Sequence, residues 1–202
     1  MGDRAIYVEV DIAAPLERVW QLTQEPANHT RWDLRFSQIT PVGELESGGY
    51  RFAYERRMPL HTIRGTGTSI GESTGARGER TSALRFTTTD RLSPLHEGRG
   101  YWRYVPTATG MRFMTGYSYR PGWGALLDRL VVGGIIGWMT AWSFDRLRIW
   151  AETGVEPERW PVTSVLQFWR PDRPLARRAR RRPTRGRAMD AAPATLDALE
   201  DP

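Results

Sequence analysis

The segment from residue 124 to residue 153 is the feature that most limits what this chain can fold into. It reads GALLDRLVVGGIIGWMTAWSFDRLRIWAET, contains no proline, and as a helix would be roughly 45 Å long. Apolar residues recur in it at helical spacing, in two adjoining rows. The first row is Leu127, Val131, Ile135, Trp138, Trp142 and Ile149, and the second is Leu126, Leu130, Phe144 and Leu147. Because these rows leave little polar surface, we expect the rest of the chain to cover this helix on most sides.

The residues before this helix alternate like short β-strands. Every second residue in 6–12 is apolar, which predicts a half-buried first strand. Pro15 suits the first turn of a helix over residues 16–23, and a second short helix over 27–32 should follow it. Glycine and proline turn signals then separate six further strands. These strands are expected at residues 36–44, 50–57, 62–72, 79–88, 98–106 and 111–120.

Together these elements predict an α+β fold in which a curved, mostly antiparallel sheet of seven strands wraps around the long C-terminal helix. Two short helices follow the first strand. The strand at 62–72 contains Gly65, Gly67 and Gly71, and interior glycines allow a sharp bend or the close approach of another group. A strongly bent sheet is what enclosing a helix requires.

Composition divides the chain into three parts. Residues 1–153 form the predicted domain, and residues 154–169 keep enough aromatic and aliphatic side chains to dock on it. Residues 170–187 hold nine arginines against one aspartate, and residues 188–202 hold four acidic residues and no base. This tail has little apolar surface to offset its ordering entropy, so we expect 170–202 to be disordered.

The charge distribution bears on partners and location. Residues 1–169 hold 20 arginines and 18 acidic residues, so the predicted domain is nearly neutral and nucleic acid is not an expected partner. The arginine-rich tail instead allows peripheral contact with an anionic membrane. The uncharged run from residue 130 to residue 144 has 15 residues, against roughly 20 for a membrane-spanning helix.

Cysteine usage and the N-terminal sequence suggest a compartment. The chain has no cysteine, which excludes a disulfide framework, a thiolate metal site and a cysteine nucleophile. The first residues alternate like a strand and lack an apolar leader, so no export signal is expected. We therefore expect a cytoplasmic protein, with peripheral membrane contact as the open alternative. All 29 Lys and Arg positions are arginine, which indicates a GC-rich genome, and we expect a bacterial protein.

Four short motifs carry a resemblance to a known family. They are IYVEVDIAAP at 6–15, ERVW at 17–20, HTRWD at 29–33 and WSFDRL at 142–147. With the order of elements, they resemble the START/SRPBCC (Bet v 1-like) superfamily with its helix-grip fold, and within it the polyketide cyclase/dehydrase and lipid-transport families. The resemblance covers about residues 4–153. Members of this superfamily include lipid and sterol carriers, hormone receptors, ubiquinone-binding proteins, and aromatases or cyclases, so fold alone does not select the function.

A helix held by a curved sheet leaves room for a mostly apolar pocket between them. The alternation of side chains along strands and their spacing along the helix predict the walls of this pocket. On one strand either Trp102 and Tyr104 or Tyr101 and Arg103 could face inward. For each residue the alternative is that it simply fills the core. The predicted ligand-binding residues are Phe52, Tyr54, Leu84, Phe86, Trp102, Tyr104, Phe113, Thr115, Tyr117, Tyr119, Val131, Ile135, Trp138 and Trp142.

Few groups could perform acid–base chemistry in such a pocket. The candidates are His29, Asp33, Glu55, Arg56, His61, Arg64, Glu97, Arg103 and Asp145. Among them His61, Arg64 and Arg103 are the candidate catalytic residues, while His29 and Asp33 have the spacing of a helical pair. No Ser-His-Asp order, metal-ligand spacing, phosphate loop or dinucleotide fingerprint is present, so neither a metal nor a cofactor is predicted.

Three functions fit these observations. The first is binding or carriage of a hydrophobic small molecule, such as a lipid, a quinone or a polyketide, without catalysis. The second is a polyketide cyclase, aromatase or dehydratase that folds its substrate and needs one or two polar groups for proton transfer. The third is a membrane-peripheral accessory protein that uses the arginine-rich tail. Ligand identity and oligomeric state are left open by the sequence.

Overall fold

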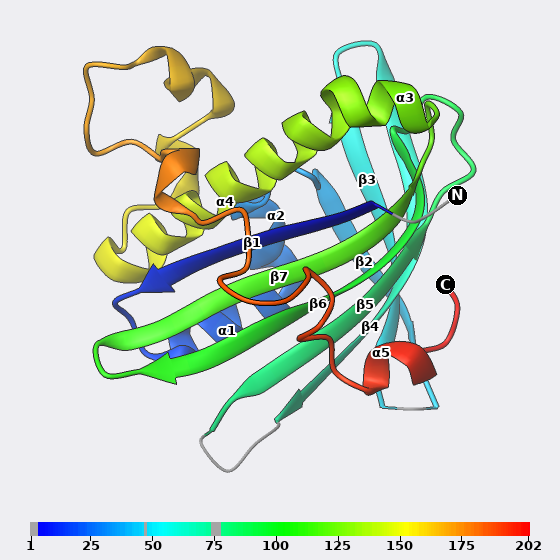
Figure 1. The fold of residues 1–202 in the computed structure, drawn as a ribbon, viewed down its shortest axis with the longest axis horizontal. Helices are drawn as coiled ribbons and strands as arrows, with labels where there is room; N and C mark the ends of the chain where they lie inside the picture. Colours follow the sequence, from blue (N-terminus) through cyan, green and yellow to red (C-terminus); the bar gives the residue numbers. More distant parts are fainter. Residues whose placement is uncertain (1–3, 47, 74–77) are drawn as a thin grey trace.

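The computed structural model describes residues 4–46, 48–73 and 78–202, and it confirms the helix-grip fold. A curved antiparallel sheet of seven strands holds the long C-terminal helix on its inner face (Figure 1). The strands are β1 (Arg4–Ile12), β2 (Gln38–Glu44), β3 (Tyr50–Met58), β4 (His61–Ser73), β5 (Arg80–Thr87), β6 (Leu95–Thr107) and β7 (Gly110–Pro121). The principal helices are α1 (Leu16–Gln24), α2 (Pro26–Trp32), α3 (Ala125–Leu127) and α4 (Gly133–Thr153).

The sheet is a meander in which only β1 lies away from its neighbour in sequence. The strand order is β1-β7-β6-β5-β4-β3-β2, and every pair is antiparallel. Val8 faces Thr115 and Val10 faces Phe113 across the β1–β7 pair, so the predicted alternation of β1 places its apolar side chains in the core. Register shifts near Pro41 and Leu95 interrupt the ladders of the two strands β2 and β6.

Two short helices cover one end of the curved sheet. Pro15 directly precedes α1, and Pro26 occupies the first turn of α2, where a missing backbone N–H costs nothing. Trp32, at the end of α2, is fully buried and donates its indole N–H to the Leu22 carbonyl at 3.0 Å. This bond ties the two helices together and fixes α2 against the interior.

The predicted long helix is nearly continuous from Ala125 to Thr153. A π-helical turn, Asp128–Val132, joins α3 to α4, and Gly154 ends α4 in the left-handed conformation with φ 75°. The turn directs buried Asp128 toward β7, where it accepts a hydrogen bond of 2.8 Å from the Tyr119 hydroxyl. One face of α4 packs on β1, α1 and α2.

Residues 154–169 dock on α4, where Trp160 is buried. The segment contains two short 3-10 turns, Pro157–Arg159 and Val162–Leu166. Buried Arg146 of α4 donates through Nε and Nη2 to the Pro157 carbonyl, at 2.9 and 2.6 Å. Burial lowers the pKa of Arg146 to about 10, which is still far above neutrality.

The tail from residue 170 onward is ordered, which corrects the prediction of disorder. It crosses the outer face of the sheet from β1 toward β4 (Figure 1). Arg180 forms a two-way backbone bridge with Glu9, and the Tyr101 hydroxyl donates to the Ala188 carbonyl at 2.9 Å. Leu196 of the short helix α5 (Thr195–Ala198) and Leu199 are buried against Leu45 and Ala83.

The correction has a physical cause. By composition, the tail has too few apolar residues to form a core of its own. The outer face of the sheet supplies the missing partners: arginines of β5 and β6 pair with acidic residues of the last turn, as Arg85 does with Asp201 and Arg99 with Asp197. Order in this tail therefore depends on contacts with strands about a hundred residues away, which local composition does not report.

Candidate functional site

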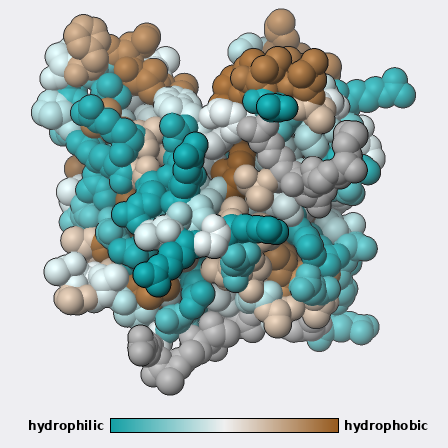
Figure 2. Space-filling view, in the orientation of Figure 1, coloured by the Kyte–Doolittle hydropathy of each residue, from teal (hydrophilic) through white to brown (hydrophobic). Residues whose placement is uncertain are grey.

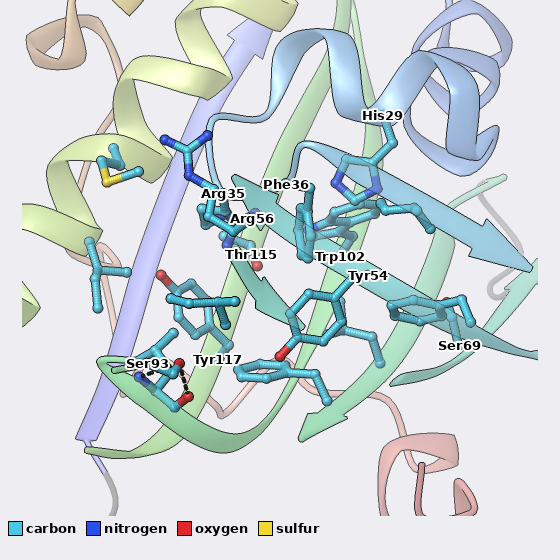
Figure 3. Close-up of a pocket in the computed structure, with 18 of the residues that line it drawn as sticks. His29, Arg35, Phe36, Tyr54, Arg56, Ser69, Ser93, Trp102, Thr115 and Tyr117 are labelled. Carbon is cyan, nitrogen blue, oxygen red and sulfur yellow. Dashed lines mark hydrogen bonds between the residues drawn. The ribbon is translucent and has the colours of Figure 1, made fainter. Parts of the chain in front are cut away.

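A cavity of about 310 Å³ lies between the inner face of the sheet and helix α4 (Figure 3). Strands β3 to β7 form its floor, α2 and the following loop close one side, and α4 contributes Ile136 and Met139. Such a volume lies at the lower end of the roughly 300–1,000 Å³ typical of small-molecule sites. Its wall consists of Gln24, His29, Arg35, Phe36, Ile39, Tyr50, Phe52, Tyr54, Arg56, Met58, Ile63, Ser69, Leu84, Phe86, Ser93, Pro94, Leu95, Trp102, Thr115, Tyr117, Ile136 and Met139.

Part of the predicted set of residues lies in the wall of this cavity. Half of the predicted ligand-binding residues are in the wall, and all of these come from strands. They are Phe52, Tyr54, Leu84, Phe86, Trp102, Thr115 and Tyr117. Side chains of alternate residues point to the same face of a strand, so once one residue is known to face inward, the other inward residues of that strand are known too. Trp102, rather than the alternative Tyr101, faces inward, since Tyr101 bonds to the tail on the outer face.

The other strand residues of the predicted set lie inward but outside the cavity. Phe113 packs against Phe144 with ring centroids 4.6 Å apart, and Tyr104 holds Thr23 and Gln24 through its hydroxyl. Tyr119 is buried beside Asp128. Phe113 and Tyr104 fill the core beneath α4 and α1, and Tyr119 fills it beneath the π-helical turn before α4.

The predicted helix residues do not line the cavity. Val131 and Ile135 are about half exposed, at 48% and 51%. Trp138 and Trp142 stack at 6.5 Å on the side of α4 that faces the segment 165–181. The inward row is one residue further along, at Ile136 and Met139, whereas Trp138 and Trp142 of the predicted row lie beside Val165 and Leu175 of the C-terminal segment.

Aromatic rings lie flat across glycines to form the floor. Phe52 lies over Gly67, and Tyr54 lies over Gly65, its partner in the β3–β4 register. Phe86 covers Gly98 of β6 in the same way, so that a Cβ at any of these glycines would clash with the ring above it. The expected close approach to the glycines of 62–72 is therefore made by side chains of the neighbouring strands.

A buried polar group stands at the α2 side of the cavity. The predicted His29–Asp33 pair is present, with Nε2 and Oδ2 3.1 Å apart, and Arg35 binds both carboxylate oxygens of Asp33, with Nη2 2.6 Å from Oδ2. Burial alone would raise the pKa of Asp33, but Arg35 and His29 outweigh it and hold that pKa well below its usual range. The carboxylate therefore stays ionised, and Nε2 of His29 must carry the donated proton.

Burial dominates the titration of His29. Its ring stacks on Trp32 at 5.1 Å and meets Phe36 and Trp102 edge-on. Desolvation lowers the pKa of His29 below its ordinary value despite the hydrogen bond to Asp33. The imidazole is consequently neutral near pH 7, with Nδ1 available as an acceptor.

Further polar groups reach the cavity from the sheet. Tyr117 shares a hydrogen bond of 3.1 Å with Thr140 of α4, and the Arg35 guanidinium lies over the Tyr117 ring at 5.4 Å. Burial raises the pKa of Tyr54 to about 12, so its hydroxyl remains protonated. Arg56 also lines the cavity, and burial lowers its pKa. The lining can thus offer hydrogen bonds and positive charge within a largely apolar wall.

The three candidate catalytic residues are not brought together and do not line the cavity. His61 pairs with Asp90 at 2.7 Å, beyond the end of the cavity floor. Arg64 and Arg103 point to the outer face of the sheet, where they pair with Glu55 and Glu79. Two other candidates are also in ion pairs. Glu97 pairs with Arg120, and Asp145 pairs with both Arg148 and Arg178.

Sequence reasoning missed Arg35 and the residues of the loop before β6, such as Ser93 and Pro94. No periodicity marks these loop positions. Arg35 had one available signal, its place two residues after an acidic residue that pairs with His29. Across residues 4–46, 48–73 and 78–202, no three His, Asp or Glu side chains are grouped in a way that could hold a metal ion.

Two apolar areas are exposed on the surface (Figure 2). They lie along the upper edge of this view, one over the start of the long helix and one over the docked extension. The helix patch is Trp123, Leu126, Leu127, Leu130, Val131 and Ile135, and the extension patch is Val162, Leu166, Phe168 and Trp169. By length and composition Ala125–Thr153 could cross a membrane, but 44% of its most apolar window is buried inside the protein.

Comparison with known proteins gives relatives in sequence and in structure. A Bacillus subtilis (strain 168) protein, YndG, described as an uncharacterized membrane protein, is 37% identical over 171 residues. The match covers 82% of this chain, which spans only 64% of that relative's length. The Zhui aromatase/cyclase from Streptomyces sp. R1128 superposes with a TM-score of 0.53 at 12% identity, over 76% of this chain and 99% of that chain.

Other solved structures share the fold at similarly low identity. The protein Ara h 8.0201 superposes with a TM-score of 0.57 at 11% identity, over 74% of this chain and 98% of that chain. Residues 4–152 match the family model described as polyketide cyclase / dehydrase and lipid transport, which is the span that the sequence motifs indicated. This chain therefore belongs to the polyketide cyclase/dehydrase and lipid transport family.

Proposed function

We propose that this protein binds a hydrophobic small molecule, such as a lipid, a quinone or a polyketide, in the cavity between the sheet and α4. The observation that carries the proposal is the cavity wall itself, in which aromatic and aliphatic side chains surround about 310 Å³. Membership of a family that includes lipid transport supports it. A planar or acyl ligand would lie against the flat rings of Phe52, Tyr54 and Phe86.

Displacement of a neutral fluorescent probe, N-phenyl-1-naphthylamine, tests this proposal. The wild-type protein should enhance the probe's emission, and lipids or quinones should displace it. Leu84→Trp should fill the cavity and abolish the enhancement, because Leu84 is part of the wall. Val42→Trp, at an exposed position of β2, is the matched control and should bind as the wild type does. Equal probe binding by both variants would refute the proposal.

Cyclase or dehydratase activity is the alternative that the His29–Asp33 pair favours. A neutral imidazole held by a carboxylate in the cavity wall is suited to proton transfer. The family and the likeness to an aromatase/cyclase support this alternative. If the protein turns over a polyketide, His29→Phe should abolish turnover while ligand binding persists. Loss of ligand binding together with turnover would instead show that His29 serves binding and not proton transfer.

Peripheral association with a membrane is a second function, and the exposed helix patch and extension patch favour it. Large exposed apolar areas on a protein surface commonly mark interaction sites. A groove between α4 and the segment 165–181 carries Arg173, Arg177 and Arg181 beside Trp138, so basic groups accompany the apolar areas. Such groups suit the phosphates of an anionic bilayer.

Co-sedimentation with vesicles of phosphatidylglycerol and phosphatidylcholine tests the membrane role. Leu126→Glu combined with Leu130→Glu should release the protein, because both side chains are more than two-thirds exposed, at 72% and 70%. Arg177→Glu with Arg181→Glu should weaken binding only to the anionic vesicles. Val42→Glu, which is exposed but outside both patches, is the control. Unchanged sedimentation of the Leu126/Leu130 variant would exclude this surface.

A further inference from the structure

Arg56 is unusual among the arginines of the sheet because it points into the cavity. Along β3 it continues the inward row of Phe52 and Tyr54, and it faces Ile63 across the β3–β4 pair. Figure 3 shows Arg56 and Arg35 in the same part of the cavity. Its sequence neighbours Glu55 and Arg57 belong to the outer face, where they pair with each other.

Arg56 has no hydrogen bond or ion pair with any residue that the structure describes, and this separates it from Arg35. Arg35 is neutralised by the bidentate contact with Asp33. Asp33 attracts Arg56 electrostatically without a hydrogen bond, and this attraction is weaker than the desolvation that lowers the pKa of Arg56. A guanidinium group remains charged under these conditions, so Arg56 carries a positive charge without a partner.

The cavity wall as a whole is therefore positive. Its cations are Arg35 and Arg56, its imidazole is neutral, and its set of wall residues includes no aspartate or glutamate. Asp33, behind the wall, makes its ion pair with Arg35 and none with Arg56. Arg56 is half-buried, so its charge is partly desolvated without an ion-pair partner, and its planar guanidinium matches the two oxygens of a carboxylate.

We propose that the cavity selects hydrophobic molecules that carry a carboxylate, and that Arg56 binds this group. The inference rests on the proposed binding function and specifies its ligand class. The acid would lie near the end of β3, and the hydrocarbon part would extend along the strand over Tyr54 and Phe52. Tyr54 lies two positions and Phe52 four positions before Arg56. In an extended strand, Phe52 is therefore about 13 Å from Arg56.

Decanoate and decanol form a matched pair of probes, used at neutral pH to displace N-phenyl-1-naphthylamine. Arg56→Met should weaken decanoate binding by roughly 10- to 100-fold, because it removes a charge-assisted hydrogen bond to the carboxylate. Decanol binding should change by less than about 3-fold, because it makes no ionic contact. Arg56→Lys should retain most of the preference for the acid. Arg64→Met, on the outer face of the neighbouring strand, should leave both affinities unchanged.

The outcomes separate this inference from the function on which it rests. Equal weakening of the acid and the alcohol in Arg56→Met, or no weakening of either, would overturn the carboxylate assignment and leave hydrophobic binding intact. No displacement by either probe from the wild type would overturn both. Without ligand, Arg56→Met should unfold at no lower urea concentration than the wild type, because it removes a desolvated charge. Marked destabilisation would indicate a structural role for Arg56 and refute the assignment.

Discussion

The two halves of the space enclosed by the sheet differ in how they are filled. Over β1, β7 and the end of β6, helices α1, α2 and α4 press their side chains onto the strands. There Phe113 stacks on Phe144 at 4.6 Å and meets Tyr104 at 5.0 Å. Over β3, β4 and β5, the rings of Phe52 and Tyr54 instead face the cavity. We call these the packed half and the open half.

The difference teaches that aromatic residues on one concave sheet do not share one role. The helix crosses the packed half closely, so its strands bear core residues. The open half lies farther from α4, and no helix fills the gap. A ligand can therefore be accommodated without opening the core, and stability and binding should be separable by mutation.

The largest expected effect contrasts Phe113→Ala with Phe52→Ala. Phe113 is completely buried among other rings, so its truncation leaves a void and should cost about 4 kcal/mol of unfolding free energy. Phe52 borders a cavity that already exists, so its truncation loses fewer contacts and should cost about 2 kcal/mol. Urea denaturation measures both. Equal costs would show that the two halves are packed alike.

A smaller contrast compares two adjacent residues of α4. Ile136 is 7% exposed and lines the cavity, and Ile136→Ala should lower the free energy of unfolding by about 2 kcal/mol. Ile135 is half exposed, and Ile135→Ala should change it by less than about 0.5 kcal/mol. Thermal denaturation of the two variants provides the comparison. A larger loss for Ile135 would restore the helix face that the sequence analysis predicted.

The smallest expected effect is a pH dependence set by His29, where the two halves meet. Its folded-state pKa lies below the unfolded value, so the unfolded chain binds more protons as the pH falls through about 6.5. Stability should therefore decrease between pH 7 and pH 5. The low pKa of Asp33 acts in the same direction but only below about pH 4.

Urea denaturation of His29→Phe at pH 7 and at pH 5 isolates this contribution. The substitution keeps a ring against Trp32 and removes the titrating group, so the decrease on acidification should be smaller than in the wild type. An identical decrease in both proteins would assign the effect to other groups.

The sequence predicted most of the fold because short-range patterns determine it. Alternation located β1, Pro15 marked the first short helix, and a proline-free apolar run gave the long helix. The inward-facing residues of the strands followed from the two-residue alternation of side chains. The face of α4 did not follow, because this helix is apolar nearly all round and its partners on the far side, residues 154–178, could not be placed from sequence.

Polar features of the site were harder to predict, since ion pairing depends on distances in space. Arg64 and Arg56 lie on neighbouring strands and look equivalent as residues in a sequence. One pairs with Glu55 on the outer face, and the other enters the cavity. Likewise, the order of the tail rests on Glu9, Tyr101 and Arg85, which are remote in sequence.

The rings that rest on Gly65, Gly67 and Gly98 have a consequence for how such a protein can change its selectivity. The depth of the cavity depends on three positions beneath the rings at which no side chain is present. A single methyl group added there would meet both the ring and a carbonyl oxygen of the next strand, that of Thr87, Arg85 or Ser118, so ring and strand would have to move together. The shape of the cavity is thus held from beneath its floor, by three residues that have no side chain at all.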